Sequence, residues 1–182
     1  MPESIEQTRF FRYGTPQEPV QLYSGETLPE VTVAYETYGT LNPAADNAIL
    51  LFHSLSGSQH AHGFSPAVPG IEPLWTDDCH RGWWDAFIGP GHALDTDQFF
   101  VICANWLGGC YGSTGPRSVN PETGRPWASD FPLLHFADIV DAQVRLLDEL
   151  GIEQLHAVTG PSLGGMLAMN LAARFPERVR IV

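Results

Sequence analysis

Three short runs of consecutive apolar residues predict strands that are buried on both faces of a sheet. They span residues 47–53, 98–105 and 155–160. Ahead of them, residues 18–39 alternate polar and apolar positions around Gly25, a pattern typical of an antiparallel hairpin or meander. The pattern therefore predicts an antiparallel first section followed by buried strands.

Two segments carry apolar residues at helical spacing instead. Residues 135–150 have them on one helical face, and Gly151 follows as a stop signal. A second helix is predicted after Ser162, ending near Pro176, and residues 179–182 resemble the opening of another strand. Strands that alternate with helices predict an α/β fold, a mostly parallel sheet with helices on both faces.

Composition and charge narrow the class of protein. With 43% hydrophobic and 16% charged residues, residues 1–182 suit one globular domain. A net charge of −12 argues against nucleic acid and against an anionic membrane surface as partners. The start has no basic-then-apolar leader, no apolar run approaches membrane-spanning length, and the three cysteines are irregularly spaced. These features predict a cytoplasmic protein.

The most specific local motif is Gly160-Pro161-Ser162-Leu163-Gly164, which fits the pattern G-x-S-x-G. In this pattern a sharp strand-to-helix turn lifts the serine above the sheet, and small flanking residues relieve the crowding. A serine between glycines is also a common turn or cap residue. The apolar strand before Ser162 and the helix after it favour a catalytic nucleophile.

A nucleophilic serine needs two backbone N–H groups to hold the oxyanion of its intermediate. The Leu163 N–H, at the start of the following helix, is the first candidate. The loop after an earlier buried strand supplies the second donor in such sheets, and residues 53–57 occupy that place, with Leu55 as the predicted donor. An ordinary strand-to-loop turn is the alternative interpretation of this loop.

With these motifs in place, the chain resembles the N-terminal half of the homoserine O-acyltransferases of the α/β-hydrolase superfamily, the acetyltransferases above all. The resemblance extends from about Arg9 to Val182. Its most specific stretches are residues 82–96, 104–124, 130–140 and 160–166. It implies an α/β-hydrolase core whose helical lid and C-terminal strands follow the part present here.

The resemblance also implies an activity. Ser162 matches the family nucleophile, and Leu55 and Leu163 match its oxyanion hole. Family members are generally cytoplasmic homodimers that use no metal and bind no cofactor, taking an acyl-CoA as donor substrate. The expected reaction transfers acetyl from acetyl-CoA to the hydroxyl of L-homoserine through a seryl acyl-enzyme, in methionine biosynthesis. A homoserine or serine O-succinyltransferase, a serine esterase and a catalytically inactive fragment remain as alternatives.

The chain departs from the family pattern in two ways. Pro161 stands where the family usually has glycine, and Leu163 stands where it often has methionine. The loop at residues 53–57 has the sequence HSLSG in place of the more usual HALTG. The triad order is Ser, then Asp or Glu, then His, yet the 20 residues after Ser162 contain no Asp and no His. They contain Glu177, but its place in the loop after the second predicted helix is a poor one for the acid partner. The acid and base are therefore expected outside this chain, which is interpreted as a fragment with little or no turnover of its own.

Two further clusters suggest other chemistry. His60, His62, Cys79 and His80 could hold zinc, but their spacing fits no common structural site, so metal-free loop histidines are expected. The glycines around Cys110 could suggest a phosphate cradle, but no G-K-[ST] ending follows. A turn cluster near the active site is the preferred interpretation there.

Overall fold

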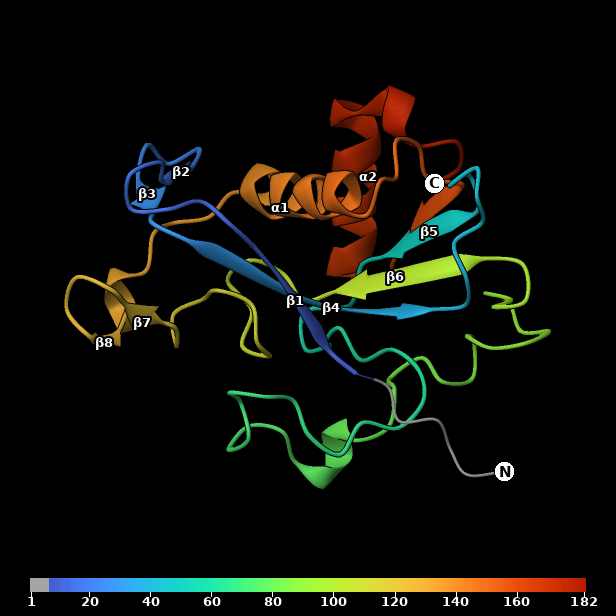
Figure 1. Cartoon of the computed structure of the whole chain (residues 1–182), viewed down its shortest axis with the longest axis horizontal. Coiled ribbons are helices and arrows are strands. Elements are labelled where there is room, and N and C mark those ends of the chain that lie inside the picture. The colour runs from blue at the N-terminus through green and yellow to red at the C-terminus, as the bar shows by residue number, and fades with distance from the viewer. Residues whose placement is uncertain (1–6) are drawn as a thin grey trace.

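The structure, a computed structural model, describes residues 7–182; residues 1–6, part of the predicted single domain and of the start searched for a leader, lie outside the described residues. A five-stranded sheet with the strand order β1-β4-β6-β5-β9 forms its centre (Figure 1). The strands are β1 (Arg9–Tyr13), β4 (Val31–Tyr38), β6 (Phe100–Ala104), β5 (Ala48–Leu51) and β9 (Ala157–Thr159).

The direction of the strands confirms a mostly parallel sheet. β5 pairs in parallel with β6 and with β9, whereas β4 pairs antiparallel with β1 and β6. β4 therefore runs against the other strands of this sheet. All three predicted apolar strands are present, and the loops after β5, β6 and β9 leave the sheet at one edge. In open α/β sheets this carboxyl edge is where ligands bind.

Short elements complete the antiparallel part and the loops. The predicted hairpin is β2 (Val20–Gln21) with β3 (Thr27–Leu28), and a second small hairpin joins β7 (Val119–Asn120) to β8 (Arg125–Pro126). Single 3₁₀ turns span Asp77–Cys79, Ala128–Asp130 and Pro176–Arg178.

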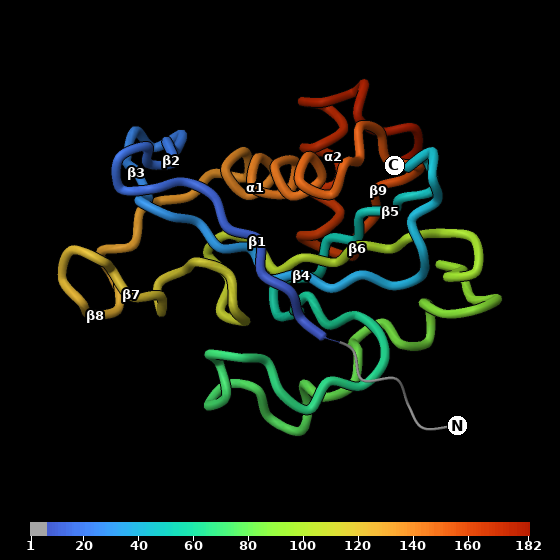
Figure 2. The backbone as a smooth tube through the Cα atoms, viewed as in Figure 1, coloured from blue at the N-terminus to red at the C-terminus, as the bar shows by residue number. Residues whose placement is uncertain are grey.

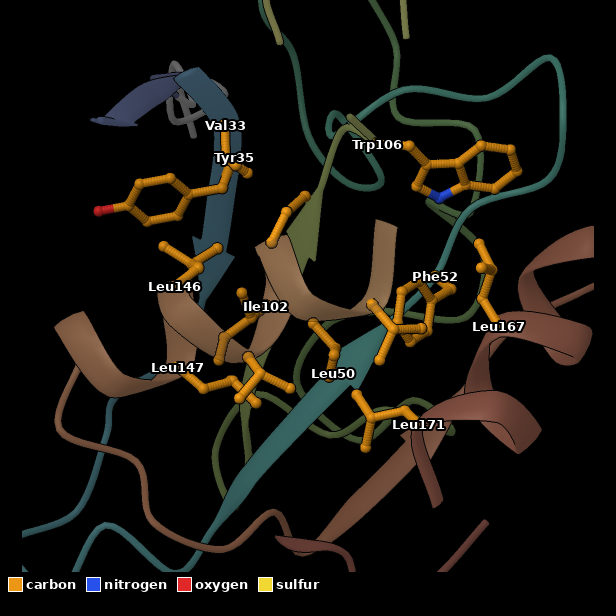
Figure 3. Close-up of a cluster of buried hydrophobic side chains, with 14 of the residues drawn as sticks. Val33, Tyr35, Leu50, Phe52, Ile102, Trp106, Leu146, Leu147, Leu167 and Leu171 are labelled. Carbon is orange, nitrogen blue, oxygen red and sulfur yellow. The ribbon is translucent and has the colours of Figure 1, made fainter. Parts of the chain in front are cut away.

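Both long helices pack on the same face of the sheet. α1 (Phe136–Glu149) buries Val140, Leu146 and Leu147, and α2 (Leu163–Arg174) buries Leu167 and Leu171. Figure 3 shows these leucines gathered with Leu50 and Phe52 at β5 and with Ile102 of β6. This cluster is the larger of the two apolar cores.

The opposite face of the sheet is covered by loops, not by helices. There Leu51, Val101 and Cys103 of the sheet pack with Ala61 and Ile88 from the long segment 54–97. In Figure 1 this segment lies below the sheet, and the helices lie above it. The prediction of helices on both faces is thus wrong for residues 7–182. This packing could not be predicted from the sequence pattern, because the apolar residues of segment 54–97 follow no helical or strand period.

Residues 179–182 lie beside β9, with the C-terminus close to that strand (Figure 2). Leu155 and Val179 form an isolated parallel bridge, and the Val158 N–H donates to the Ile181 carbonyl at 2.9 Å. The predicted strand opening is therefore present as a parallel pairing. In the part of the chain that the structure describes, no helix has the length and apolarity required to cross a bilayer.

Candidate active site

The backbone of Ser162 has a conformation that L-residues rarely adopt. Its φ is 56° and its ψ is −123°, although it follows a strand and precedes a helix. This is the mirror image of extended backbone, which only glycine enters freely. Ser162 stands at the N-cap of α2, yet its hydroxyl makes no capping hydrogen bond, and the residue is exposed. The interpretation as an ordinary cap residue therefore fails, because the capping bond is missing.

The flanking glycines are required by a close approach of the chain to β5. A Cβ atom on Gly160 would stand 2.6 Å from the Phe52 carbonyl oxygen. A Cβ atom on Gly164 would meet the same oxygen and would stand 2.6 Å from the carbonyl oxygen of His53. The turn and the end of β5 thus touch backbone to backbone, which leaves no room for side chains at the two glycines of the motif.

Pro161 fits the turn despite its departure from the family pattern. Its carbonyl accepts a hydrogen bond from the Gly164 N–H at 2.9 Å, and the Ser162 carbonyl accepts one from Gly165 at 3.0 Å. Proline has no N–H to satisfy and lies ahead of the first helical residue, where its fixed φ does no harm.

The two predicted oxyanion donors are available as hydrogen-bond donors. Within residues 7–182, no acceptor contacts the backbone N–H of Leu55 or of Leu163. Leu163 is the first residue of α2, where free N–H groups and the helix dipole favour negative charge. Leu55 lies in a tight turn closed by a hydrogen bond from the Gly57 N–H to the Ser54 carbonyl at 2.9 Å.

His53 precedes this turn and is almost wholly buried, with 2% of its surface exposed. Its ring stacks on Trp106 with 4.3 Å between ring centroids and 8° between planes. Its Nδ1 lies 2.6 Å from the Ser54 carbonyl oxygen. Burial lowers the pKa of His53 to about 4, and the hydrogen bond to Ser54 only partly offsets this. His53 is therefore neutral near pH 7.

The long segment 54–97 is anchored to β4 by a buried acid–base pair that the sequence analysis did not identify. The Glu36 carboxylate on β4 lies 2.8 Å from His60 Nδ1, and both residues are 1% exposed. Glu36 also accepts hydrogen bonds from the hydroxyls of Tyr38 and Thr8. Glu36 lies in a strand that also contains Thr32 and Thr37, so its burial had no direct signal in the sequence.

The candidate zinc residues are engaged elsewhere. His60 pairs with Glu36, and His62 Nδ1 lies 2.8 Å from an Asp85 carboxylate oxygen. Cys79 lies near the Leu74 carbonyl and the Thr76 hydroxyl. Among the residues that the structure describes, no group of three His, Cys, Asp or Glu side chains is arranged to hold a metal ion.

The glycine-rich segment after β6 forms a cluster of turns, as predicted. The Gly108 N–H donates to the Thr114 carbonyl at 2.7 Å, and the Gly109 N–H donates to the Trp106 carbonyl at 2.9 Å. These turns border a cavity of about 830 Å³ whose other walls are β1, the start of β4 and residues 69–74. Ser162 does not line this cavity, so it is separate from the serine turn.

No general base reaches Ser162 within the described residues. The seven histidines all precede Ser162, and none shares a hydrogen bond with it in residues 7–182. The structure thus brings together a strained serine and two free N–H groups on neighbouring loops, without an acid–base partner.

The chain is similar in sequence to known homoserine acyltransferases. The chain is 52% identical over 181 residues to homoserine O-acetyltransferase of Symbiobacterium thermophilum, covering 99% of this chain and 45% of that protein. It is 53% identical over 163 residues to homoserine O-succinyltransferase of Azoarcus sp., covering 89% of this chain and 41% of the relative. The chain thus spans less than half the length of these relatives.

Two solved structures have the same fold. Homoserine O-acetyltransferase from Bacillus anthracis superposes with a TM-score of 0.84 at 39% identity, covering 98% of this chain and 46% of that one. Esterase E22 superposes with a TM-score of 0.82 at 38% identity, covering 96% and 46%. Residues 47–182 match the family described as alpha/beta hydrolase fold. The chain therefore belongs to the alpha/beta hydrolase fold family, with homoserine O-acyltransferases as its homologues.

Proposed function

We propose that the full-length protein transfers an acetyl group from acetyl-CoA to the side-chain hydroxyl of L-homoserine, with Ser162 as the nucleophile. The observation that carries the proposal is the strained, exposed and uncapped Ser162 between β9 and α2. Strain of this kind persists where function requires it. Relatives named as homoserine acyltransferases support homoserine as the acceptor.

The reaction has two steps. In the first, Ser162 Oγ attacks the thioester carbonyl while its proton passes to a general base, and the C–S bond breaks to release CoA as the thiol. In the second, the homoserine hydroxyl attacks the seryl ester and gives its proton to the general base. The bond between the acyl carbon and Ser162 Oγ breaks, Oγ takes the proton back from the base, and the O-acetyl ester of homoserine leaves. The N–H groups of Leu55 and Leu163 hold the oxyanion of both tetrahedral intermediates. In this fold the general base is a histidine that follows the nucleophile in the sequence.

Two other outcomes are favoured by particular relatives. The similarity to a homoserine O-succinyltransferase makes succinyl-CoA the competing donor. The similarity to esterase E22 makes water the competing acceptor. The wider proposal, by resemblance to the family, is a cytoplasmic homodimer in methionine biosynthesis that needs no metal.

Thiol release from acetyl-CoA and succinyl-CoA by the full-length protein, with and without homoserine, separates these outcomes. Transfer predicts steady release that needs homoserine, whereas hydrolysis predicts equal release without it. A single burst of thiol should accompany formation of the acyl-enzyme, and Ser162→Ala should abolish it. A burst of unchanged size in Ser162→Ala would reject the nucleophile.

A further inference from the structure

The carbonyl oxygen of Ser54 accepts two hydrogen bonds. One comes from the Gly57 N–H at 2.9 Å and closes the turn. The other is the 2.6 Å contact with His53 Nδ1. A carbonyl oxygen can only accept, so Nδ1 must carry the proton of this neutral imidazole. The second bond thus fixes both the tautomer of His53 and the direction of the Ser54 carbonyl.

This carbonyl belongs to the same peptide unit as the Leu55 N–H. The unit is planar and trans, so its C=O and N–H point in opposite directions. Holding the Ser54 oxygen against His53 therefore aims the Leu55 N–H away from His53. That N–H has no acceptor within residues 7–182, which is the state an oxyanion donor needs before substrate binds.

His53 is itself held on several sides. Its ring is stacked on Trp106, and a Cβ on Gly57 would approach the His53 side chain to 2.9 Å. Its own carbonyl lies against Gly164, two residues after the nucleophile. A side chain that is locked in this way can impose an orientation on the next peptide.

We propose that His53 is a positioning residue for acyl transfer, whose Nδ1–H holds the Ser54–Leu55 peptide so that the Leu55 N–H faces the oxyanion formed on Ser162. The inference rests on the proposed function, because it gives Leu55 a role in catalysis. His53 itself touches no reacting atom. Its effect belongs to the transition state and should appear in kcat, with KM unchanged.

A pair of variants distinguishes positioning from mere packing. His53→Phe keeps an aromatic ring over Trp106 but has no donor. His53→Asn loses the ring but can present its side-chain N–H at the place of Nδ1. Loss of an oxyanion donor costs about 100- to 1000-fold in kcat. Because Gly57 still holds the Ser54 oxygen, we expect a loss of about 10- to 100-fold in the acylation rate for His53→Phe. His53→Asn should remain within about 3-fold of the wild-type protein.

A double-mutant cycle tests whether His53 acts through Leu55. Leu55 is the second residue of the turn that Ser54 and Gly57 close, a position where proline is favoured, so Leu55→Pro removes the N–H while suiting the turn. In the Leu55→Pro background, adding His53→Phe should lower the acylation rate by less than about a further 2-fold. Full additivity of the two losses, or a faster Phe variant than Asn variant, would overturn the inference.

The rates are measured as the thiol burst of the full-length protein, and nitrogen-15 spectra of its histidines supply a readout besides activity. The expected spectrum has His53 neutral, with the proton on Nδ1. A proton on Nε2 instead would overturn the inference even in an active enzyme. If the wild-type protein forms no ester on Ser162, the proposed function fails and the inference fails with it. A wild-type burst with an unchanged His53→Phe rate rejects the inference alone.

Discussion

The carbonyl oxygen of Phe52 lies 2.6 Å from the position that a Cβ atom would take on Gly160. Phe52 directly precedes the loop with the predicted donor Leu55, and Gly160 precedes Ser162 by two residues. The two loops therefore share a backbone contact as well as a sheet edge. Any side chain placed between them must shift one loop relative to the other, and with it the proposed oxyanion donors Leu55 and Leu163.

Gly164→Ala should destabilise the protein and impair acylation together. Its new Cβ would collide with the backbone of Phe52 and His53, which cannot rotate away as a side chain can. Overpacking of this kind costs about 1–3 kcal/mol of unfolding free energy, more than the gain in helix propensity of about 1 kcal/mol. Gly165→Ala is the matched control, since its Cβ would approach only the Gly160 oxygen, at 3.0 Å. Urea unfolding measures both variants. An equal loss of unfolding free energy in Gly165→Ala would contradict the view that the contact with the Phe52 and His53 backbone requires glycine at position 164.

Ser162→Gly should be more stable than Ser162→Ala. Both variants lack the proposed nucleophile, so both should fail to form an acyl-enzyme. Only glycine relaxes at a φ of 56° and a ψ of −123°, where a Cβ is strained by about 1–3 kcal/mol. Thermal unfolding of the two variants measures this difference. Equal melting temperatures would show that the backbone of residue 162 stores no strain.

The serine turn was predictable because its chemistry is local. A strained turn of this kind needs glycine on both sides, an apolar strand before it and a helix after it, and the residues next to Ser162 in the sequence supply all of these. The strands and helices were predictable for a related reason, since their apolar periods are continuous. The cover of the sheet by residues 54–97 was not, because loops bury residues without any period.

The roles of Glu36 and His53 depend on residues far away in the sequence. Glu36 looks like a polar position of an alternating strand until His60, 24 residues later, is seen against it. His53 could be placed beside the predicted donor Leu55 from the sequence, but the plane of its ring depends on its stack with Trp106. Tertiary contacts decide both, so a single sequence carries no direct signal for either.

The burial of His53 predicts a loss of stability in acid. Its folded-state pKa is about 4, below the ordinary value of 6.5, so between these values the unfolded chain binds a proton that the folded protein does not. Its stabilising contribution is complete above pH 6.5 and is lost as the pH falls towards 4. By pH 5 the loss is about 2 kcal/mol.

His53→Asn cannot titrate and is the comparison for this effect. The difference in unfolding free energy between wild type and His53→Asn should therefore shrink by about 2 kcal/mol from pH 7 to pH 5. Urea unfolding at both pH values measures it. A difference that does not change with pH would mean that His53 is not held neutral by burial.

The Glu36–His60 pair should behave as one unit with the opposite pH dependence. Burial lowers the pKa of His60, but the hydrogen bond and charge of Glu36 more than compensate, so the pKa is raised above 6.5. The stabilisation is complete below pH 6.5 and is lost as the pH rises through the folded-state value. His60 Nε2 lies 3.1 Å from the His80 carbonyl, so both ring nitrogens have acceptors and the ring can carry the charge.

Glu36→Leu and His60→Leu should each destabilise the protein by about 3–5 kcal/mol, because each leaves a buried polar partner without its complement. The double variant removes both charges, and its cost should fall clearly short of the sum of the two single costs. Urea unfolding at pH 6 and pH 8 measures all four proteins. The coupling should be larger at pH 6, where the His60 ring is charged. Strict additivity at both pH values would reduce the pair to two independent packing contacts.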